Sequence, residues 1–130
     1  MKVLIVEDDY ASRMVLQKLL APYGETDMAE NGEEAITAFL ASQESGNRYD
    51  VICLDIMMPE KDGQTVLKEV RAIESVWGIE PGKGARVIMT TALSDKENLL
   101  KAVQQCDAYL VKPINRNDLL FYLKKFGLVK

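Results

Sequence analysis

The sequence predicts an α/β protein with a doubly wound, five-stranded parallel sheet flanked by five helices. Short apolar runs rich in branched residues alternate along the chain with stretches whose apolar residues recur at helical spacing. The strand-like runs are continuously apolar, which indicates burial on both faces. A parallel sheet covered by helices on both sides satisfies that requirement, and right-handed crossovers connect its strands.

Five segments are expected to form the strands. Four of them are strongly apolar, and the fifth, Glu25–Ala29, is weaker because it carries two acidic residues. The strong segments are Val3–Val6, Val51–Leu54, Arg86–Thr90 and Ala108–Val111.

Five amphipathic stretches are expected to form the helices. Their apolar residues at helical spacing are Ala11, Met14, Val15 and Leu19, then Ala35, Ala38 and Phe39, then Val66, Val70 and Ile73, then Leu99, Ala102 and Val103, and last Leu119, Leu123 and Phe126. Helix boundaries are indicated by Gly24, Gly32, Gly63 and Gly127, and by Asp95 and Asn115 as N-caps. The segment 77–84 holds three glycines and a proline, which predicts a connector.

Length, composition and charge limit the classes of function that the chain could have. A chain of 130 residues, 48% hydrophobic, fits a single domain over residues 1–130, and we expect no output domain. The net charge of −4 disfavours direct nucleic-acid binding. We see no signal peptide or membrane span, so we expect no membrane insertion and a cytoplasmic location. The chain has no histidine, and Cys53 and Cys106 are expected to be buried thiols.

Polar residues follow the predicted strands at the edge where ligands bind in such sheets. They are Glu7, Asp8 and Asp9 after the first strand, Asp55 after the third, Thr91 after the fourth and Lys112 after the fifth. Carboxylates brought together repel one another unless a cation is present, and oxygen ligands suit Mg²⁺. Taken singly, each residue has an ordinary explanation as a helix cap or a solvated charge, but their joint placement favours a Mg²⁺ site.

Four motifs give this pattern a specific resemblance. They are Val6-Glu7-Asp8-Asp9, Leu54-Asp55-Ile56-Met57-Met58-Pro59 with Asp62-Gly63, Thr91-Ala92, and Tyr109-Leu110-Val111-Lys112-Pro113. Together they resemble the receiver family of two-component response regulators over nearly the whole chain. The resemblance implies a flavodoxin-like fold with strand order 2-1-3-4-5.

The resemblance also implies roles at the site. Asp55 would be the phosphoacceptor. Asp8 would bind Mg²⁺ directly, Glu7 mainly through water, and the Met57 main-chain carbonyl would be a further ligand. Lys112 and the metal would neutralise the oxygens of the phosphoryl group during transfer. The expected chemistry is phosphorylation and dephosphorylation of the protein's own aspartate, rather than turnover by a conventional enzyme.

A switch is implied as well. Thr91 would accept the new phosphoryl group as a hydroxyl partner, Tyr109 would turn into the vacated space, and the bond before Pro113 would be cis. The donor would be a histidine kinase, a histidine phosphotransfer protein or a small molecule such as acetyl phosphate. The phosphorylated form would present a changed face to a downstream protein.

Three other functions stay open. The chain could be a phosphorelay intermediate, a Mg²⁺-dependent phosphatase acting on a metabolite, or an interaction module that no longer uses phosphorylation. A phosphatase would usually need a second catalytic aspartate just beyond Asp55 and a substrate cap. Failure to label with acetyl phosphate would favour the interaction module.

Two features depart from the family pattern. The connector before the fourth strand is long and carries Trp77, the only tryptophan. We expect Trp77 to lie against the third helix, and a contact with a partner protein is the alternative. The residues two positions after Asp55 and after Thr91 are Met57 and Leu93, both apolar. Neither side chain can hydrogen-bond an attacking water, so we predict a long-lived phosphoryl state.

Overall fold

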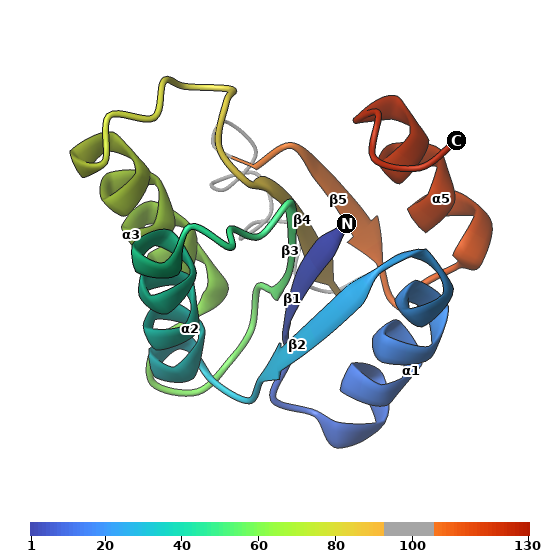
Figure 1. Cartoon of the computed structure of the whole chain (residues 1–130). Helices are drawn as coiled ribbons and strands as arrows, with labels where there is room; N and C mark the ends of the chain where they lie inside the picture. Colours follow the sequence, from blue (N-terminus) through green and yellow to red (C-terminus); the bar gives the residue numbers. More distant parts are fainter. Residues whose placement is uncertain (93–105) are drawn as a thin grey trace.

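The strands form where branched apolar residues run without interruption. A computed structural model describes residues 1–92 and 106–130. Its strands are β1 (Lys2–Val6), β2 (Glu25–Ala29), β3 (Val51–Asp55), β4 (Arg86–Thr91) and β5 (Ala108–Val111). They pair in parallel in the order β2-β1-β3-β4-β5, which confirms the predicted topology (Figure 1). The weak segment Glu25–Ala29 is the edge strand β2.

Two layers of helices cover the sheet. The described helices are α1 (Tyr10–Leu20), continued by the 3₁₀ turn η1 (Ala21–Tyr23), then α2 (Gly32–Ser45), α3 (Gly63–Val76) and α5 (Arg116–Lys125). Figure 1 shows α2 and α3 together on one face of the sheet and α1 and α5 on the other. The predicted helix around Leu99, Ala102 and Val103, with its cap Asp95, lies outside the described residues.

Alternate residues of the buried strands enter two separate cores. In β1, Leu4 and Val6 pack beneath α2 and α3, whereas Val3 and Ile5 pack beneath α1 and α5. All four side chains are at most 1% exposed. Burial on both faces is what a continuous apolar run predicts, because successive strand side chains point to opposite faces.

Helix α1 is present as predicted, but its buried face differs. We expected Val15 to belong to the buried stripe, and it is 48% exposed. The residues buried on α1 are instead Arg13, Leu16 and Leu20. The misassignment has a simple cause: the helix carries apolar residues on two faces, and the deeper face includes an arginine, which sequence patterns place on the surface.

The predicted helix ends are largely confirmed. Asn115 accepts hydrogen bonds from the main chain of the first turn of α5, and Gly127 follows that helix with a φ of 75°. Gly32 and Gly63 are the first residues of α2 and α3. Trp77 caps the carboxyl end of α3 and is 44% exposed.

Candidate functional site

The carboxyl ends of β1 and β3 bring three acidic side chains together. Glu7 and Asp8 follow β1, and Asp55 is the last residue of β3. One carboxylate oxygen from each lies within 4.8 Å of the other two. Asp9 serves a different purpose, because its side chain accepts a hydrogen bond from Ser12 N at 2.9 Å and caps α1.

Strands β3 and β4 are each one residue longer than we predicted, and this extension positions the site. The Ile56 amide donates to the Thr90 carbonyl at 3.0 Å, and the Lys112 amide donates to the Thr91 carbonyl at 2.7 Å. The sheet ladder therefore continues up to the functional side chains, so Asp55 and Thr91 sit on sheet backbone instead of on free loops.

Lys112 supplies the positive charge at the site. Its Nζ lies 2.9 Å from Glu7 Oε2 and 3.4 Å from Asp55 Oδ1. Burial acts to lower the pKa of Lys112, but the two carboxylates outweigh it and the pKa is raised. The peptide bond between Lys112 and Pro113 is cis. Lys112 is therefore charged at neutral pH and held between the two acids.

The pKa of the Asp55 carboxyl group is raised above its ordinary value. The side chain is almost buried, and desolvation followed by the charge of Glu7 raises its pKa to about 7, against the opposing effect of Lys112. The Met57 amide donates to Asp55 Oδ1 at 3.3 Å, which favours the ionised form slightly. A single ammonium group does not balance the two buried carboxylates.

The donor set fits a hard divalent cation. Lys112 Nζ, 2.9 Å from the buried Glu7 Oε2, is one positive charge beside a cluster of three carboxylates. Carboxylates this close repel one another, and a divalent cation would neutralise the remaining negative charge. Carboxylate oxygens with no sulfur or imidazole suit Mg²⁺. Glu7, Asp8 and Asp55 are therefore the residues that would hold the ion.

The loop after β3 approaches the site closely. The Gly63 amide donates to the Ile56 carbonyl at 2.9 Å and closes the loop at its base. A Cβ at Gly63 would collide with the Asp55 carbonyl oxygen and would lie 2.8 Å from Ile56 Cα. Only glycine allows α3 to begin this close to the end of β3.

Sequence reasoning missed Arg13. This arginine of α1 is 7% exposed, and its guanidinium donates to the Glu7 carbonyl at 2.9 Å and to Glu30 Oε1 at 3.3 Å. It fixes the main chain that carries the acidic pair. No sequence signal identifies it, because one arginine in an amphipathic helix is most simply explained as a surface residue.

Thr91 and Tyr109 lie on the same face of the sheet. Met89 pairs with Tyr109, and Thr91 pairs with Val111, so the alternation of strand side chains places them on one side. Thr91 is 2% exposed and donates to the Ala92 carbonyl at 3.0 Å, whereas Tyr109 is 43% exposed. Of the two apolar residues expected beside the phosphoryl group, Met57 is 51% exposed and Leu93 lies outside the described residues.

The geometry agrees with a family comparison. Residues 3–124 match the family model "Response regulator receiver domain". The chain belongs to this family. Receiver domains act with histidine kinases and downstream effectors in two-component signalling, and the family generally binds Mg²⁺.

Individual relatives support the assignment. The receiver is 30% identical to the chemotaxis protein CheY of Bacillus subtilis, covering 95% of both chains. It is 35% identical to the hybrid signal transduction histidine kinase L of Dictyostelium discoideum over 97% of its own length and 7% of the kinase. It matches the transcriptional regulatory protein RprY of Bacteroides fragilis at 32% identity over 95% of its own length and 48% of the regulator.

Solved structures agree on the fold. The receiver superposes on a response regulator receiver domain protein from Clostridium thermocellum with a TM-score of 0.78 and 26% identity, covering 96% of this chain and 92% of the other. The chemotaxis protein CheY4 of Vibrio cholerae gives a TM-score of 0.71 and 29% identity, with coverage of 96% and 97%.

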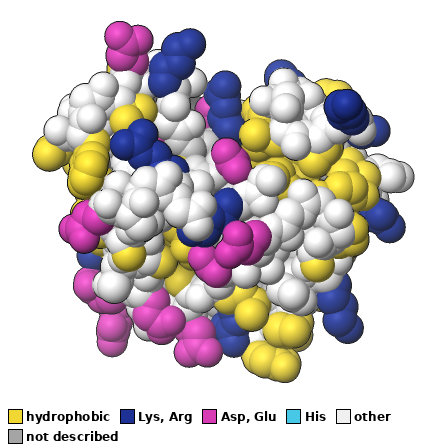
Figure 2. Space-filling view, viewed as in Figure 1, with side chains coloured by type: hydrophobic (Ala, Val, Ile, Leu, Met, Phe, Trp, Pro, Cys, Tyr) yellow, Lys and Arg dark blue, Asp and Glu magenta, His cyan; other side chains and the backbone are white. Residues whose placement is uncertain are grey.

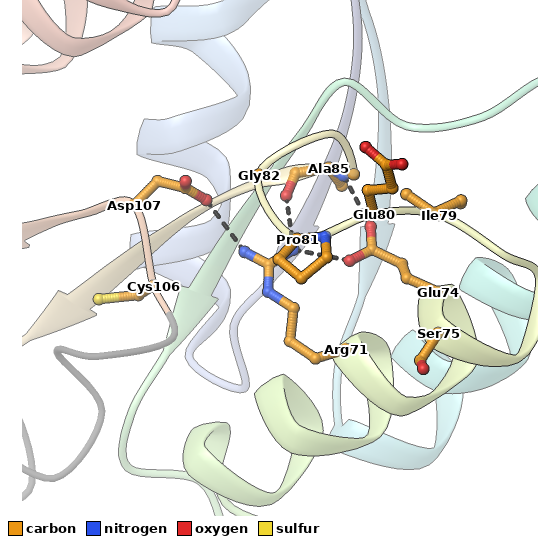
Figure 3. Close-up of a pocket in the computed structure, with 11 residues that line it drawn as sticks. Arg71, Glu74, Ser75, Ile79, Glu80, Pro81, Gly82, Ala85, Cys106 and Asp107 are labelled. Atoms are coloured by element: carbon orange, nitrogen blue, oxygen red, sulfur yellow. Dashed lines mark hydrogen bonds and ion pairs between the residues drawn. The ribbon is translucent and has the colours of Figure 1, made fainter.

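A hollow of about 370 Å³ lies beneath the connector, at the amino ends of β4 and β5 and thus at the end of the strands opposite Asp55 (Figure 3). Its polar side chains pair with one another: Arg71 donates to Glu74 at 2.8 Å and to Asp107 at 3.0 Å, and the Ala85 amide donates to Glu74 at 2.7 Å. A Cβ at Gly84 would collide with the Glu74 carboxylate. These contacts fasten the connector to α3 and to the residue before β5.

Charged side chains are unevenly distributed on the surface. On the face shown in Figure 2, acidic side chains gather towards the lower left, beside α2, and basic side chains are scattered.

Within residues 1–92 and 106–130, no helix combines the length and apolar character needed to cross a bilayer.

Proposed function

We propose that this receiver is a phosphorylation-activated switch in which Asp55 accepts a phosphoryl group with the help of Mg²⁺. The observation that carries the proposal is the convergence of Glu7, Asp8 and Asp55 within 4.8 Å of one another, with Lys112 Nζ 3.4 Å from Asp55. This arrangement combines an acceptor carboxylate, a set of oxygen ligands and a cation in one small volume.

The transfer makes one bond and breaks one. A carboxylate oxygen of Asp55 forms the new bond to phosphorus, and the bond from phosphorus to the donor breaks, with its electron pair leaving on the donor. Mg²⁺ bound by the acidic residues supplies charge neutralisation for the phosphoryl oxygens. Lys112 steadies the same oxygens from the side of β5, and Arg13 holds the main chain of Glu7 in place.

The response begins at Thr91. Its hydroxyl donates to the Ala92 carbonyl before phosphorylation, and it turns to a phosphoryl oxygen afterwards. Tyr109, on the same face of the sheet and 43% exposed, then turns inward. The phosphorylated packing is favoured because these contacts exist only when the phosphoryl group is present.

The proposed donors are phosphohistidine proteins, either a histidine kinase or a histidine phosphotransfer protein, and small acyl phosphates. The hybrid kinase and the transcriptional regulator among the relatives contain domains of this family in signalling proteins. The downstream partner would recognise the face that carries Tyr109.

Labelling with acetyl phosphate and Mg²⁺ tests the proposal. Intact mass should show one added phosphoryl group on the wild type and none on Asp55→Ala or in EDTA. Asp50→Ala is a matched control, because Asp50 precedes β3 at its opposite end. Labelling of Asp55→Ala to the wild-type level, or no labelling of the wild type, would refute the assignment.

A further inference from the structure

The loop between β3 and α3, residues 56–62, is fixed at its base. The Ile56 amide joins it to β4 through the Thr90 carbonyl at 3.0 Å, and Gly63 closes it through the Ile56 carbonyl at 2.9 Å. Met58 enters the core beneath α2 and α3 and is 7% exposed. These contacts hold the start of the loop but leave its far side to be held by other residues.

Lys61 is a main contact on that far side, beside the N-cap residue Asp62. Lys61 Nζ lies 2.9 Å from Glu33 Oε1 on α2 and 2.8 Å from Glu69 Oε2 on α3, and it also donates to Glu69 Oε1 at 3.0 Å. The hydrogen bonds that Lys61 donates to Glu69 and then to Glu33 raise the pKa of Lys61, so the ammonium stays charged. A single side chain therefore ties the loop to two helices.

The aliphatic part of the Lys61 side chain packs closely against the start of α2. A Cβ at Gly32 would lie 2.8 Å from Lys61 Cγ and 2.9 Å from Lys61 Cδ. The stem thus lies directly over the first residue of α2, where a larger residue would displace it. Glycine at this position makes room for the lysine.

The neighbouring backbone requires such support. Glu60 has a φ of 67°, in the left-handed region that residues other than glycine rarely adopt. A strained residue of this kind persists only when the surrounding structure holds it. The two residues that follow contribute the ion pairs of Lys61 and the N-cap of α3, where Asp62 Oδ1 accepts a hydrogen bond from Thr65 N at 2.9 Å.

We propose that Lys61 is a positioning residue for metal binding: it fixes the loop that follows Asp55 and carries Met57, whose amide donates to Asp55 Oδ1 at 3.3 Å. The inference rests on the proposed function. Lys61 does not touch the ion or the phosphoryl group, and it acts through the main chain of residues 57–60. Both carboxylates of these pairs lie partly in solvent, which screens the charges, so we expect loss of Lys61 to weaken the metal site more than the fold.

The test measures Mg²⁺ binding through the rise in thermal midpoint that a ligand of the folded state produces. Lys61→Met should weaken Mg²⁺ binding about tenfold, the scale seen for residues that support metal ligands. Lys61→Arg should keep most of the affinity, and the double variant Glu33→Gln, Glu69→Gln should reproduce the loss. Lys68→Met is the matched control, because Lys68 is exposed on α3 and the described residues give it no ion pair.

The outcomes separate the two proposals. If the wild type binds Mg²⁺ and Lys61→Met binds it as tightly as Lys68→Met does, the positioning role is refuted while the proposed function stands. If Lys61→Met lowers the midpoint without Mg²⁺ and leaves the Mg²⁺-dependent rise unchanged, the residue is merely structural and the inference also fails. If the wild type does not bind Mg²⁺, the proposed function fails and this inference fails with it.

Discussion

Lys112 Nζ lies 0.5 Å closer to Glu7 Oε2 than to Asp55 Oδ1, at 2.9 Å against 3.4 Å. The lysine is therefore shared between a fully buried carboxylate and the proposed phosphoacceptor. This sharing leaves Asp55 only partly compensated, and its pKa is raised to about 7, mainly by burial and then by Glu7. The predictions below follow from this charge imbalance and from the contacts around it.

Asp55→Asn should stabilise the protein in the absence of Mg²⁺. The folded-state pKa of Asp55 lies above its ordinary value of 3.8, so its contribution to stability is full below pH 4 and is lost as the pH rises to about 7. The variant should therefore become more stable relative to the wild type over that window, by about 4 kcal/mol in the free energy of unfolding at pH 8. Urea unfolding at pH 5 and pH 8 measures the difference, and a gap that shrinks with rising pH would contradict it.

Mg²⁺ binding should depend on pH through the same carboxyl group. A proton on Asp55 competes with the ion, so the affinity should fall about tenfold between pH 8 and pH 6. The pKa of about 7 sets the window. Calorimetric titration at both pH values checks this, and equal affinities would show that Asp55 does not bind the ion. Asp55→Asn should bind more weakly and should lose the pH dependence.

Lys112→Met should destabilise the protein when Mg²⁺ is absent. Glu7 would then be a buried carboxylate with no cation beside it, a loss of roughly 3 kcal/mol. Saturating Mg²⁺ should restore a large part of that loss, because the ion supplies the missing charge. Thermal unfolding with and without Mg²⁺ measures both effects. A loss that Mg²⁺ does not reduce would mean that the lysine acts by packing alone.

Met57→Asn should shorten the life of the phosphoryl group. The Met57 side chain is 51% exposed beside Asp55 and cannot hydrogen-bond a water, whereas an amide can. We expect decay about tenfold faster, which corresponds to about 1.4 kcal/mol of barrier. Leu93→Glu should act in the same direction. Mass spectrometry after removal of the donor gives the rates, and Met57→Leu is the control that should leave them unchanged. Equal decay in all the variants would contradict the long-lived state.

Glu74→Gln should lower the stability of the fold and leave the proposed phosphorylation site unchanged. The charge of Glu74 compensates Arg71, and its carboxylate accepts the Ala85 amide at the far edge of the sheet. We expect a loss of about 2 kcal/mol in the free energy of unfolding. Phosphorylation rate and Mg²⁺ affinity should stay at wild-type values. A change in either would show that the two edges of the sheet are coupled.

The strands and the acidic residues were predictable because their signals are local. An uninterrupted apolar run such as Val3–Val6 can be buried only on both faces, and the polar residue that follows it must lie at the strand's end. The N-cap Asn115 is local in the same way, since its side chain bonds the turn that follows it.

Other features depend on contacts between distant residues, and the sequence does not reveal those. Arg13 is buried because the Glu7 carbonyl and Glu30 are there to receive it. Lys61 matters because α2 and α3 each present a carboxylate to it. The buried face of α1 was misassigned for the same reason, since the helix offers two apolar faces and the tertiary fold selects the one with Leu16 and Leu20.

The connector before β4 contains a suitable insertion site for protein engineering. Gly78 and Gly82 face open space, with no atom within 4 Å of where a side chain would begin, whereas Gly84 is enclosed by Glu74. A fluorescent reporter or a new pair of termini placed between residues 78 and 82 should therefore be tolerated without a steric clash. Insertion beyond residue 84 would disrupt the hydrogen bond from the Ala85 amide to Glu74. Such a fusion would place a readout at the edge of the sheet remote from Asp55.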